Sequence, residues 1–387
     1  MAADRLVYLD HAATTPMRAE AVEAMLPYLS DQFANPSGAH RFSRDARKIV
    51  DEARDRVAAV LGCAPGEVVF TSGGTEADNT AVLGVVRHQA SRRGPTVAVC
   101  PAVEHHAVLH AVESAEHRVV GVDAFGRVDL DALGAALGAD VAVVSVMAVN
   151  NEVGSITSVA DVAAVVRARA PQAALHTDAV QAASWLDLRT VTPHVDLLSL
   201  SAHKFGGPKG VGVLMARGGA AFEPLLVGGG QERERRSGTH NVAGIVAMTV
   251  ALEAADAQRD RENARLAALR DHLVDGIRAQ LDGVLETVPS AHKVAGSAHL
   301  CFEGVENEAL LFLLDEAGVC ASAASACASG AMDPSHVLAA MGVPRDLAMG
   351  ALRLTLGHAS TPGDVERGID VVVDAVGRLR RRAGAGR

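Results

Sequence analysis

The chain of 387 residues is 49% hydrophobic and 21% charged, so it can bury a large core and is not globally disordered. This length suits two coupled lobes better than one minimal domain. Lysine and arginine total 36 against 46 aspartates and glutamates, which gives a formal net charge of −10. Because no long basic run interrupts this acidic chain, we expect no strong direct binding of nucleic acid.

Five cysteines are scattered through the chain without CxxC pairs, which argues against a disulfide framework and against a zinc ribbon. The segment that begins at Met1 lacks a basic stretch followed by an apolar one, so we expect no secretory signal. Apolar stretches such as Val141–Val149 are about half as long as a membrane helix. These features predict a cytoplasmic protein without a membrane span.

Short β-branched runs alternate with helical patterns up to about residue 250. Strands are predicted over seven segments: Val68–Thr71, Thr96–Pro101, Arg118–Val122, Val141–Val149, Ala174–Asp178, Asp196–Ser201 and Val211–Ala216. Their continuous apolar character is typical of parallel strands that are buried on both faces. Amphipathic helical segments accompany these strands, such as Ser43–Leu61 ahead of the first one. This alternation predicts βαβ units in a doubly wound, mainly parallel α/β sheet.

The chain changes character after about residue 255. A long helix is predicted around Leu266–Ile277, where leucines and isoleucine recur at helical spacing. Ser297–Phe302 and Ala351–Leu356 alternate as half-exposed strands do, and helices are predicted over Glu308–Glu316, Ser335–Met341 and Asp364–Leu379. We therefore predict a large α/β domain over residues 16–255 and a small α+β domain formed by residues 1–15 with 256–387.

Polar side chains gather where the predicted strands end, and ligands of open α/β sheets bind at the carboxyl ends of strands. One such end is Thr71-Ser72-Gly73-Gly74-Thr75, where two glycines let the backbone turn closely before Thr75 opens a helix. Backbone N–H groups at a helix N-terminus, beside a hydroxyl, form an anion site that suits phosphate. An ordinary helix cap with a tight turn is the alternative interpretation.

A second strand end carries Ser201-Ala202-His203-Lys204, followed by a Gly-Gly-Pro turn. Only four lysines stand against 32 arginines in the chain, so a lysine in an apolar neighbourhood calls for a chemical reason. Desolvation lowers the pKa of an amine and makes it nucleophilic, as in the lysines that hold the aldehyde of pyridoxal 5′-phosphate. Ser201 and His203 then suit contacts to the phosphate. A surface lysine in a turn is the alternative.

Asp178 lies 26 residues before Lys204, a separation that fits two strand ends joined by a crossover. A carboxylate beside a pyridine nitrogen keeps that nitrogen protonated, so the ring can accept electrons from a carbanion. Gln181, three residues further on, then suits a hydrogen bond to the ring hydroxyl. Taken alone, Asp178 is better explained as a helix cap.

Together these segments resemble the pyridoxal-phosphate-dependent cysteine desulfurases of the class V aminotransferase group. Six motifs carry the resemblance: Ser201–Lys204, His176–Gln181, Thr71–Glu76, Val103–His106, Val149–Gly154 and Arg236–Thr239. It extends in the same order from Tyr8 to Gly357, nearly the whole chain. The resemblance implies fold type I of the pyridoxal-phosphate transferases, a homodimer, and L-cysteine as substrate.

The resemblance also implies roles for the residues at matching positions. Lys204 holds the cofactor aldehyde and shuttles protons, Asp178 meets the ring nitrogen, and His105 stacks on the ring. Further cofactor contacts are implied for Gly74, Thr75, Asn151, Gln181, Ser201, His203 and, from the other subunit, Thr239. Substrate contacts are implied for Asn35, Asn151 and Arg353, whose planar guanidinium suits a carboxylate.

The segment from Cys320 to Ala331 contains only Ala, Ser, Cys and Gly, so little anchors it in a core and we expect an accessible thiol there. Cys327 within it matches the cysteine on which the family forms a persulfide. Asp333 and Pro334, which follow, predict the N-cap and first residue of a helix. The alternative, a small buried cysteine, suits the other four cysteines better.

No metal site is predicted. His105 and His106 are adjacent, and adjacent residues of one strand point to opposite faces, so the pair is a poor ligand set for one ion. No other His or Cys cluster has the spacing of a zinc site.

The implied activity removes sulfur from L-cysteine, leaves L-alanine and a persulfide on Cys327, and passes the sulfur to an acceptor protein. That acceptor serves iron–sulfur cluster assembly, as a scaffold or iron–sulfur protein, or DNA phosphorothioation. The chain ends at Arg387, without the extension that housekeeping members use to dock a scaffold, and so resembles the shorter desulfurases of DNA phosphorothioation. Alternatives are a selenocysteine lyase, another enzyme of the same group, and a partner protein without activity.

Overall fold

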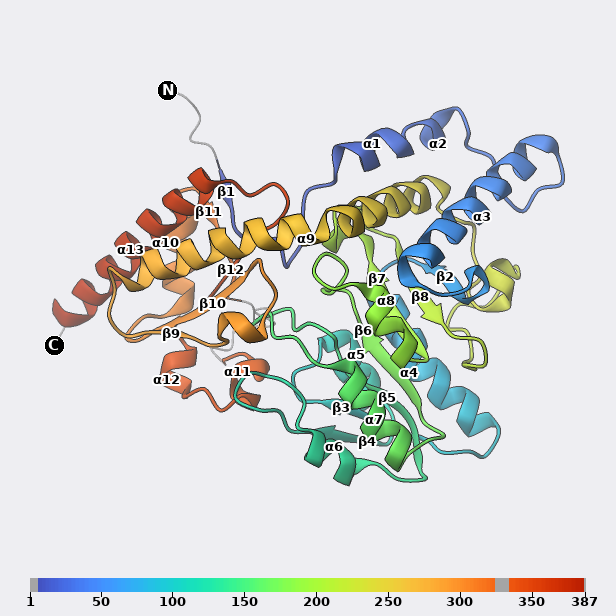
Figure 1. Ribbon diagram of the computed structural model, residues 1–387, viewed down its shortest axis with the longest axis horizontal. Helices are drawn as coiled ribbons and strands as arrows, with labels where there is room; N and C mark the ends of the chain where they lie inside the picture. The colour runs from blue at the N-terminus through green and yellow to red at the C-terminus, as the bar shows by residue number, and fades with distance from the viewer. Residues whose placement is uncertain (1–5, 324–333, 386–387) are drawn as a thin grey trace.

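The computed structural model describes residues 6–323 and 334–385, which form two lobes joined by one long helix, α9 (Val242–Arg278) (Figure 1). A helix of 37 residues is about 55 Å long, enough to cross both lobes. Its first half buries Ile245 and Met248 in the core of the larger lobe. Its second half buries Leu273 and Ile277 in the core of the smaller one.

A seven-stranded sheet forms the centre of the larger lobe, with the strand order β2-β8-β7-β6-β5-β3-β4. In that order the strands are Val68–Thr71, Gly212–Ala216, Leu197–Ser201, Ala174–Asp178, Val141–Ser145, Val97–Pro101 and His117–Val120. Strands β7, β6, β5, β3 and β4 pair in parallel, so the predicted α/β fold with a mainly parallel sheet is confirmed. The predicted strand over Val141–Val149 ends earlier, at Ser145.

Strand β8 differs from the prediction, because it runs antiparallel to both of its neighbours, β7 and β2. Only residues 202–211 join it to β7. A crossover to a parallel neighbour needs about a dozen residues or more, so this short connection returns the chain in the opposite direction. The apolar composition of β8 indicates that both of its faces are buried, but it does not indicate whether the strand runs parallel or antiparallel to its neighbours.

Helices cover both faces of this sheet, as the layers in Figure 1 show. On one face lie α4 (Gly74–Ser91) and α5 (His106–Glu113), with Leu197 and Leu214 pointing toward them. The other face carries Leu198 and Leu200 and is covered by α3 (Arg41–Leu61), α6 (Leu130–Ala136), α7 (Val159–Arg169) and the start of α9. The remaining helices of this lobe are α1 (Ala19–Met25), α2 (Pro27–Ser30) and α8 (Leu188–Val191).

The smaller lobe contains an antiparallel sheet in the order β12 (Ala351–Thr355), β10 (Ser297–Phe302), β9 (Val284–Glu286). A second, parallel pair joins β1 (Val7–Tyr8) to β11 (Val319–Cys320), so the start of the described chain lies in this lobe. Its helices are α10 (Asn307–Glu316), α11 (His336–Ala340), α12 (Arg345–Ala348) and α13 (Pro362–Ala385).

Two details of the smaller lobe differ from the predictions. β10 and β12 are buried along their whole length, not half exposed, because α9, α10 and α13 cover one face while α11 and α12 cover the other. Helix α11 begins at His336 and not at Pro334, because Ser335 is its N-cap and its Oγ accepts the N–H of Val337 at 3.0 Å. Asp333 lies outside the described residues.

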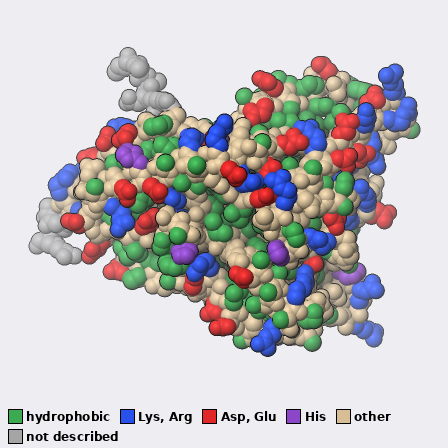
Figure 2. Space-filling model, viewed as in Figure 1, with side chains coloured by type: hydrophobic (Ala, Val, Ile, Leu, Met, Phe, Trp, Pro, Cys, Tyr) green, Lys and Arg blue, Asp and Glu red, His purple; other side chains and the backbone are tan. Residues whose placement is uncertain are grey.

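The surface of the described chain carries charges of both signs. Figure 2 shows Asp and Glu side chains interspersed with Lys and Arg over the viewed face. Apolar side chains reach the surface around α1 and α2, where Leu26, Leu29 and Phe33 are 54%, 59% and 71% exposed. Throughout residues 6–323 and 334–385, no helix combines the length and the apolar character required to cross a bilayer.

Candidate active site

A cavity of about 300 Å³ lies where strands β2, β3, β5, β6 and β7 end. Ten residues that the sequence singled out line it together: Gly74, Thr75, His105, Asn151, Asp178, Gln181, Ser201, His203, Lys204 and Arg353. Arg353 comes from β12 of the smaller lobe, so both lobes contribute. The folded chain therefore brings together side chains that are up to 279 residues apart (353 − 74).

Lys204 stands in the wall of this cavity, in the short turn that follows β7. Its Nζ donates hydrogen bonds to the carbonyl oxygens of Ala12 at 2.6 Å and Ala13 at 3.0 Å. Burial lowers the pKa of Lys204 to about 8, and the charge of Arg353 adds to this effect while Asp178 and Asp10 oppose it. About a tenth of this amine is therefore uncharged at pH 7 and able to attack an aldehyde, far more than for an ordinary lysine.

This lowered pKa predicts how Lys204 reacts with aldehydes at different pH. Only the neutral amine attacks, so the rate is expected to rise about tenfold per pH unit up to about pH 8 and then level off. Trapping the adduct of pyridoxal with borohydride from about pH 6 to about pH 10, followed by peptide mass spectrometry, measures it. The exposed Lys48 is the internal control, and a Lys204 profile that keeps rising to pH 10 contradicts the prediction.

Asp178, the last residue of β6, is a buried carboxyl opposite this amine. Burial raises its pKa to about 6, although the N–H of Val180, 2.8 Å from Oδ1, and the charge of Lys204 oppose the shift. The carboxyl is thus mostly ionised at neutral pH. His176, on the same strand, is held between the hydroxyls of Ser145 and Ser199 at 2.8 Å and 2.9 Å, and burial lowers its pKa to about 3.

Two further buried carboxyls lie near Asp178, and neither was given a role from the sequence. Asp78, in α4, lines the cavity, and Glu104 lies fully buried just before His105. Burial raises the pKa of both, and the charge of Asp178 adds to the shift in each case. Glu104 belongs to the Val103–His106 motif that the sequence singled out, whereas Asp78 lies within a helix and carried no local signal.

The turn between β2 and α4 has the features of an anion site. Gly73 has a φ of 152°, which side chains rarely allow, and a Cβ on Gly74 would lie 2.7 Å from Cγ2 of Val180, so both positions favour glycine. Among the described residues no side chain caps the N-terminus of α4. Its first-turn N–H groups, with the nearby Ser201 and His203, are therefore placed to bind an anion such as a phosphate.

His105 is the N-cap of α5, and its Nδ1 accepts the N–H of Ala107 at 3.1 Å. Burial lowers the pKa of His105 to about 4, and the charge of Lys204 adds to the shift, so the ring is neutral at physiological pH. The strand geometry assumed for His105 and His106 was wrong, because both belong to the start of a helix. In the part of the chain that the structure describes, no group of three His, Cys, Asp or Glu side chains is arranged to hold a metal ion.

Arg353 is 5% exposed and already binds a carboxylate. Its Nη2 donates to Asp10 at 2.7 Å and its Nη1 to the carbonyl oxygen of Asn151 at 2.8 Å. Its Nε has no hydrogen-bond partner among the described residues, although it is buried. Arg353 is thus oriented by Asp10 and keeps donors, Nε among them, for a second carboxylate. The role of Asp10 was not anticipated, although it belongs to the motif at Tyr8 that marked the start of the resemblance.

Two predicted site residues, Asn35 and Thr239, lie outside this cavity. Asn35 is exposed, and its Oδ1 accepts the N–H of Ser37 at 2.9 Å, outside the cavity. Thr239 lines a separate, smaller cavity of about 80 Å³ together with Ser72. Cys327 lies outside the described residues. Within one chain, therefore, Asn35 and Thr239 do not join the Lys204 cavity, and their roles stay predictions.

A desolvated lysine opposite a carboxylate, beside a helix start that suits an anion, is an arrangement typical of enzymes that use an aldehyde cofactor. Residues 7–367 match the family model "Aminotransferase class-V", so the chain belongs to the class V aminotransferase family. It is 41% identical over 382 residues to "Cysteine desulfurase IscS" of Methanosarcina thermophila, covering 97% of this chain and 93% of the relative.

Solved structures agree with this assignment. A "NifS-like protein" superposes with a TM-score of 0.90 at 34% identity, covering 97% of this chain and 100% of that one. DndA from Streptomyces lividans superposes with a TM-score of 0.75 at 33% identity, covering 90% and 99%. The predicted family, fold class and enzymatic nature of the protein are thereby confirmed.

Proposed function

We propose that this protein is a cysteine desulfurase, which removes the sulfur of L-cysteine and leaves L-alanine. One observation carries the proposal: the Lys204 amine, with its pKa lowered to about 8, lines the same cavity as Asp178 and Arg353. The names of relatives such as the Methanosarcina enzyme support L-cysteine as the substrate.

The residues of the cavity fit pyridoxal 5′-phosphate. The start of α4 with Thr75, Ser201 and His203 suits the phosphate, because it offers N–H and hydroxyl donors with no side-chain cap. Asp178 suits the ring nitrogen, His105 the ring face, and Gln181 and Asn151 the ring hydroxyl. When bound, this cofactor supplies an electron sink for the charge that develops at the substrate Cα.

The chain's own side chains then have distinct tasks. Arg353 binds the substrate carboxylate through the donors that Asp10 leaves free, and Lys204, as a neutral amine, takes the proton from Cα. The thiolate of Cys327 forms a bond to the substrate sulfur while the Cβ–S bond breaks. The electron pair left on the substrate takes up protons and yields L-alanine, so that cysteine and one thiol become alanine and one persulfide.

The proposal includes a cytoplasmic homodimer. Leu26, Leu29 and Phe33 supply an exposed apolar surface that a second copy suits. The exposed Thr239 is assigned to the partner's phosphate site on the resemblance to the family. The persulfide passes to an acceptor protein. The name IscS among the relatives favours iron–sulfur cluster assembly, while the likeness to DndA supports phosphorothioation as the second candidate.

Incubation of the purified protein with pyridoxal 5′-phosphate, L-cysteine and a thiol reductant tests the activity. We expect L-alanine and sulfide in equal amounts, because each turnover releases one of each. Turnover of L-selenocysteine without turnover of L-cysteine would instead identify a selenocysteine lyase. Formation of a keto acid would identify an aminotransferase. A protein that binds the cofactor and turns over none of these substrates would contradict an enzymatic role.

A further inference from the structure

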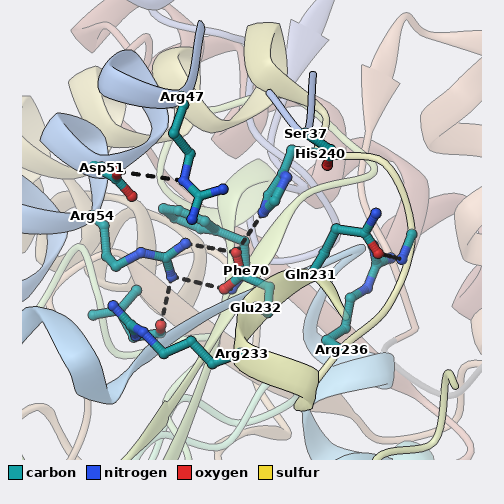
Figure 3. Close-up of polar contacts among 12 residues, drawn as sticks. Ser37, Arg47, Asp51, Arg54, Phe70, Gln231, Glu232, Arg233, Arg236 and His240 are labelled. Atoms are coloured by element: carbon teal, nitrogen blue, oxygen red, sulfur yellow. Dashed lines mark hydrogen bonds and ion pairs between the residues drawn. The ribbon is translucent and has the colours of Figure 1, made fainter. Parts of the chain in front are cut away.

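A buried carboxylate outside the cavity, Glu232, is the centre of a second polar network (Figure 3). Its side chain is 2% exposed, and it binds the guanidinium of Arg54 through two hydrogen bonds of 2.7 Å and 2.6 Å. It also accepts the ring N–H of His240 at 2.7 Å. Burial opposes its ionisation, but the hydrogen bonds from Arg54 and His240 prevail and lower the pKa of Glu232 to about 2.

This network closes the free edge of β2, the outermost strand of the large sheet. Glu232 accepts the backbone N–H of Phe70 at 2.9 Å, and Arg54 donates to the carbonyl oxygen of Val68 at 2.7 Å. The ion pair therefore takes the place of a further strand along β2. Because β2 continues directly into Gly73 and Gly74, the network fixes the strand that leads to the anion site.

The backbone around Glu232 adopts an uncommon conformation. Glu232, Arg233 and Glu234 have φ values of 49°, 58° and 65°, in the left-handed region that residues other than glycine seldom occupy. Three such residues in succession persist only where their surroundings hold them. The four hydrogen bonds to the Glu232 carboxylate are the contacts in place to do so.

The same segment reaches the anion site from its other side. Arg236, four residues after Glu232, donates to Glu76 in the first turn of α4 at 2.8 Å. Glu76 in turn accepts the backbone N–H of Ser72 at 2.8 Å. Residues 232–236 thus hold both the strand before the Ser72–Gly74 turn and the helix after it.

We propose that Glu232 is a positioning residue for the cofactor phosphate, which acts by fixing the Ser72–Gly74 turn through β2 and through Arg236 and Glu76. The inference rests on the proposed function, because it assumes that a phosphate binds at the start of α4. It concerns only the phosphate. Removal of the Glu232 charge should therefore weaken binding of pyridoxal 5′-phosphate while leaving binding of pyridoxal, which lacks the phosphate, unchanged.

The test compares these two probes by absorbance titration of the full chain. For Glu232→Gln we expect the dissociation constant of pyridoxal 5′-phosphate to rise about tenfold and that of pyridoxal to stay as in the unaltered protein. Glu76→Gln leaves the Glu232 network intact and should show the same selective loss. The double variant should lose less than the product of the two single losses, because both act on one turn.

Glu253→Gln is the matched control. Glu253, in α9, accepts a hydrogen bond from the guanidinium of Arg56, which lies in α3 as Arg54 does. This pair joins α3 to α9 and does not touch β2. We expect this variant to bind both probes as the unaltered protein does. Thermal unfolding of each cofactor-free variant shows whether it folds. If Glu232→Gln does not fold, the comparison of the two probes is made with Glu76→Gln.

Equal weakening of both probes would overturn the inference, because it indicates a general structural role for Glu232. Unchanged binding of pyridoxal 5′-phosphate to both variants would overturn it as well. In each of these cases the proposed function stands, since the unaltered protein binds the cofactor. If the unaltered protein binds neither probe, the proposed function and this inference fail together.

Discussion

Replacement of Lys204 by alanine is expected to abolish stable binding of pyridoxal 5′-phosphate and desulfuration of L-cysteine. Among the described residues that line the cavity, this amine is the group that suits attachment to an aldehyde, and it is also the proposed proton acceptor at Cα. The lost proton transfer alone accounts for a decrease in rate of ~10²–10⁴-fold. Absorbance of the purified variant and alanine formation measure the two losses separately.

Lys209→Ala provides the control for this experiment. Lys209 lies five residues further along (209 − 204), is exposed, and lines neither the Lys204 cavity nor the smaller cavity that contains Thr239. The Lys209→Ala variant loses the same charge and the same kind of side chain, but outside the cavity. We therefore expect its cofactor binding and turnover to be unchanged. A Lys204→Ala protein that keeps the colour and the rate of the unaltered protein would contradict the site assignment.

The position of the cavity was predictable from the sequence because strand ends can be recognised locally. Apolar runs followed by polar residues identified the ends of β2, β3, β6 and β7, and the parallel sheet brings those ends to one edge. The direction of β8 was not predictable from its apolar pattern, because burial on both faces looks the same in either direction. The short connection after β7 was the informative feature.

Contacts between distant residues were beyond the reach of local patterns. Asp10 meets Arg353 across 343 residues and Glu232 meets Arg54 across 178, and nothing near either acid in the sequence indicates its partner. The alternation in β10 and β12 indicated half-exposure because the sequence does not show that α11 and α12 cover their second face. The domain boundary at residue 255 stays a prediction, since α9 continues through it without a break.

Replacement of Cys327 by serine is expected to leave cofactor binding intact and to stop sulfur transfer. The four cysteines that the structure describes are less suited to this role. Burial raises the pKa of all four thiols: Cys63 to about 11, Cys301 to about 12, and Cys100 and Cys320 also above the usual value. Each is therefore protonated and a poor nucleophile at neutral pH. Loss of a covalent nucleophile should lower alanine formation on the order of 10³-fold or more.

Cys320→Ser is the matched control, because Cys320 is half-buried, lies seven residues before Cys327 (327 − 320), and has a pKa raised by burial and by Asp315 and Asp10. It should keep both the absorbance and the rate. After a brief incubation with L-cysteine, peptide mass spectrometry should find one added sulfur on the Cys327 peptide of the unaltered protein and of Cys320→Ser. Added sulfur on the Cys320 peptide instead, or full activity of Cys327→Ser, would move the persulfide to another thiol.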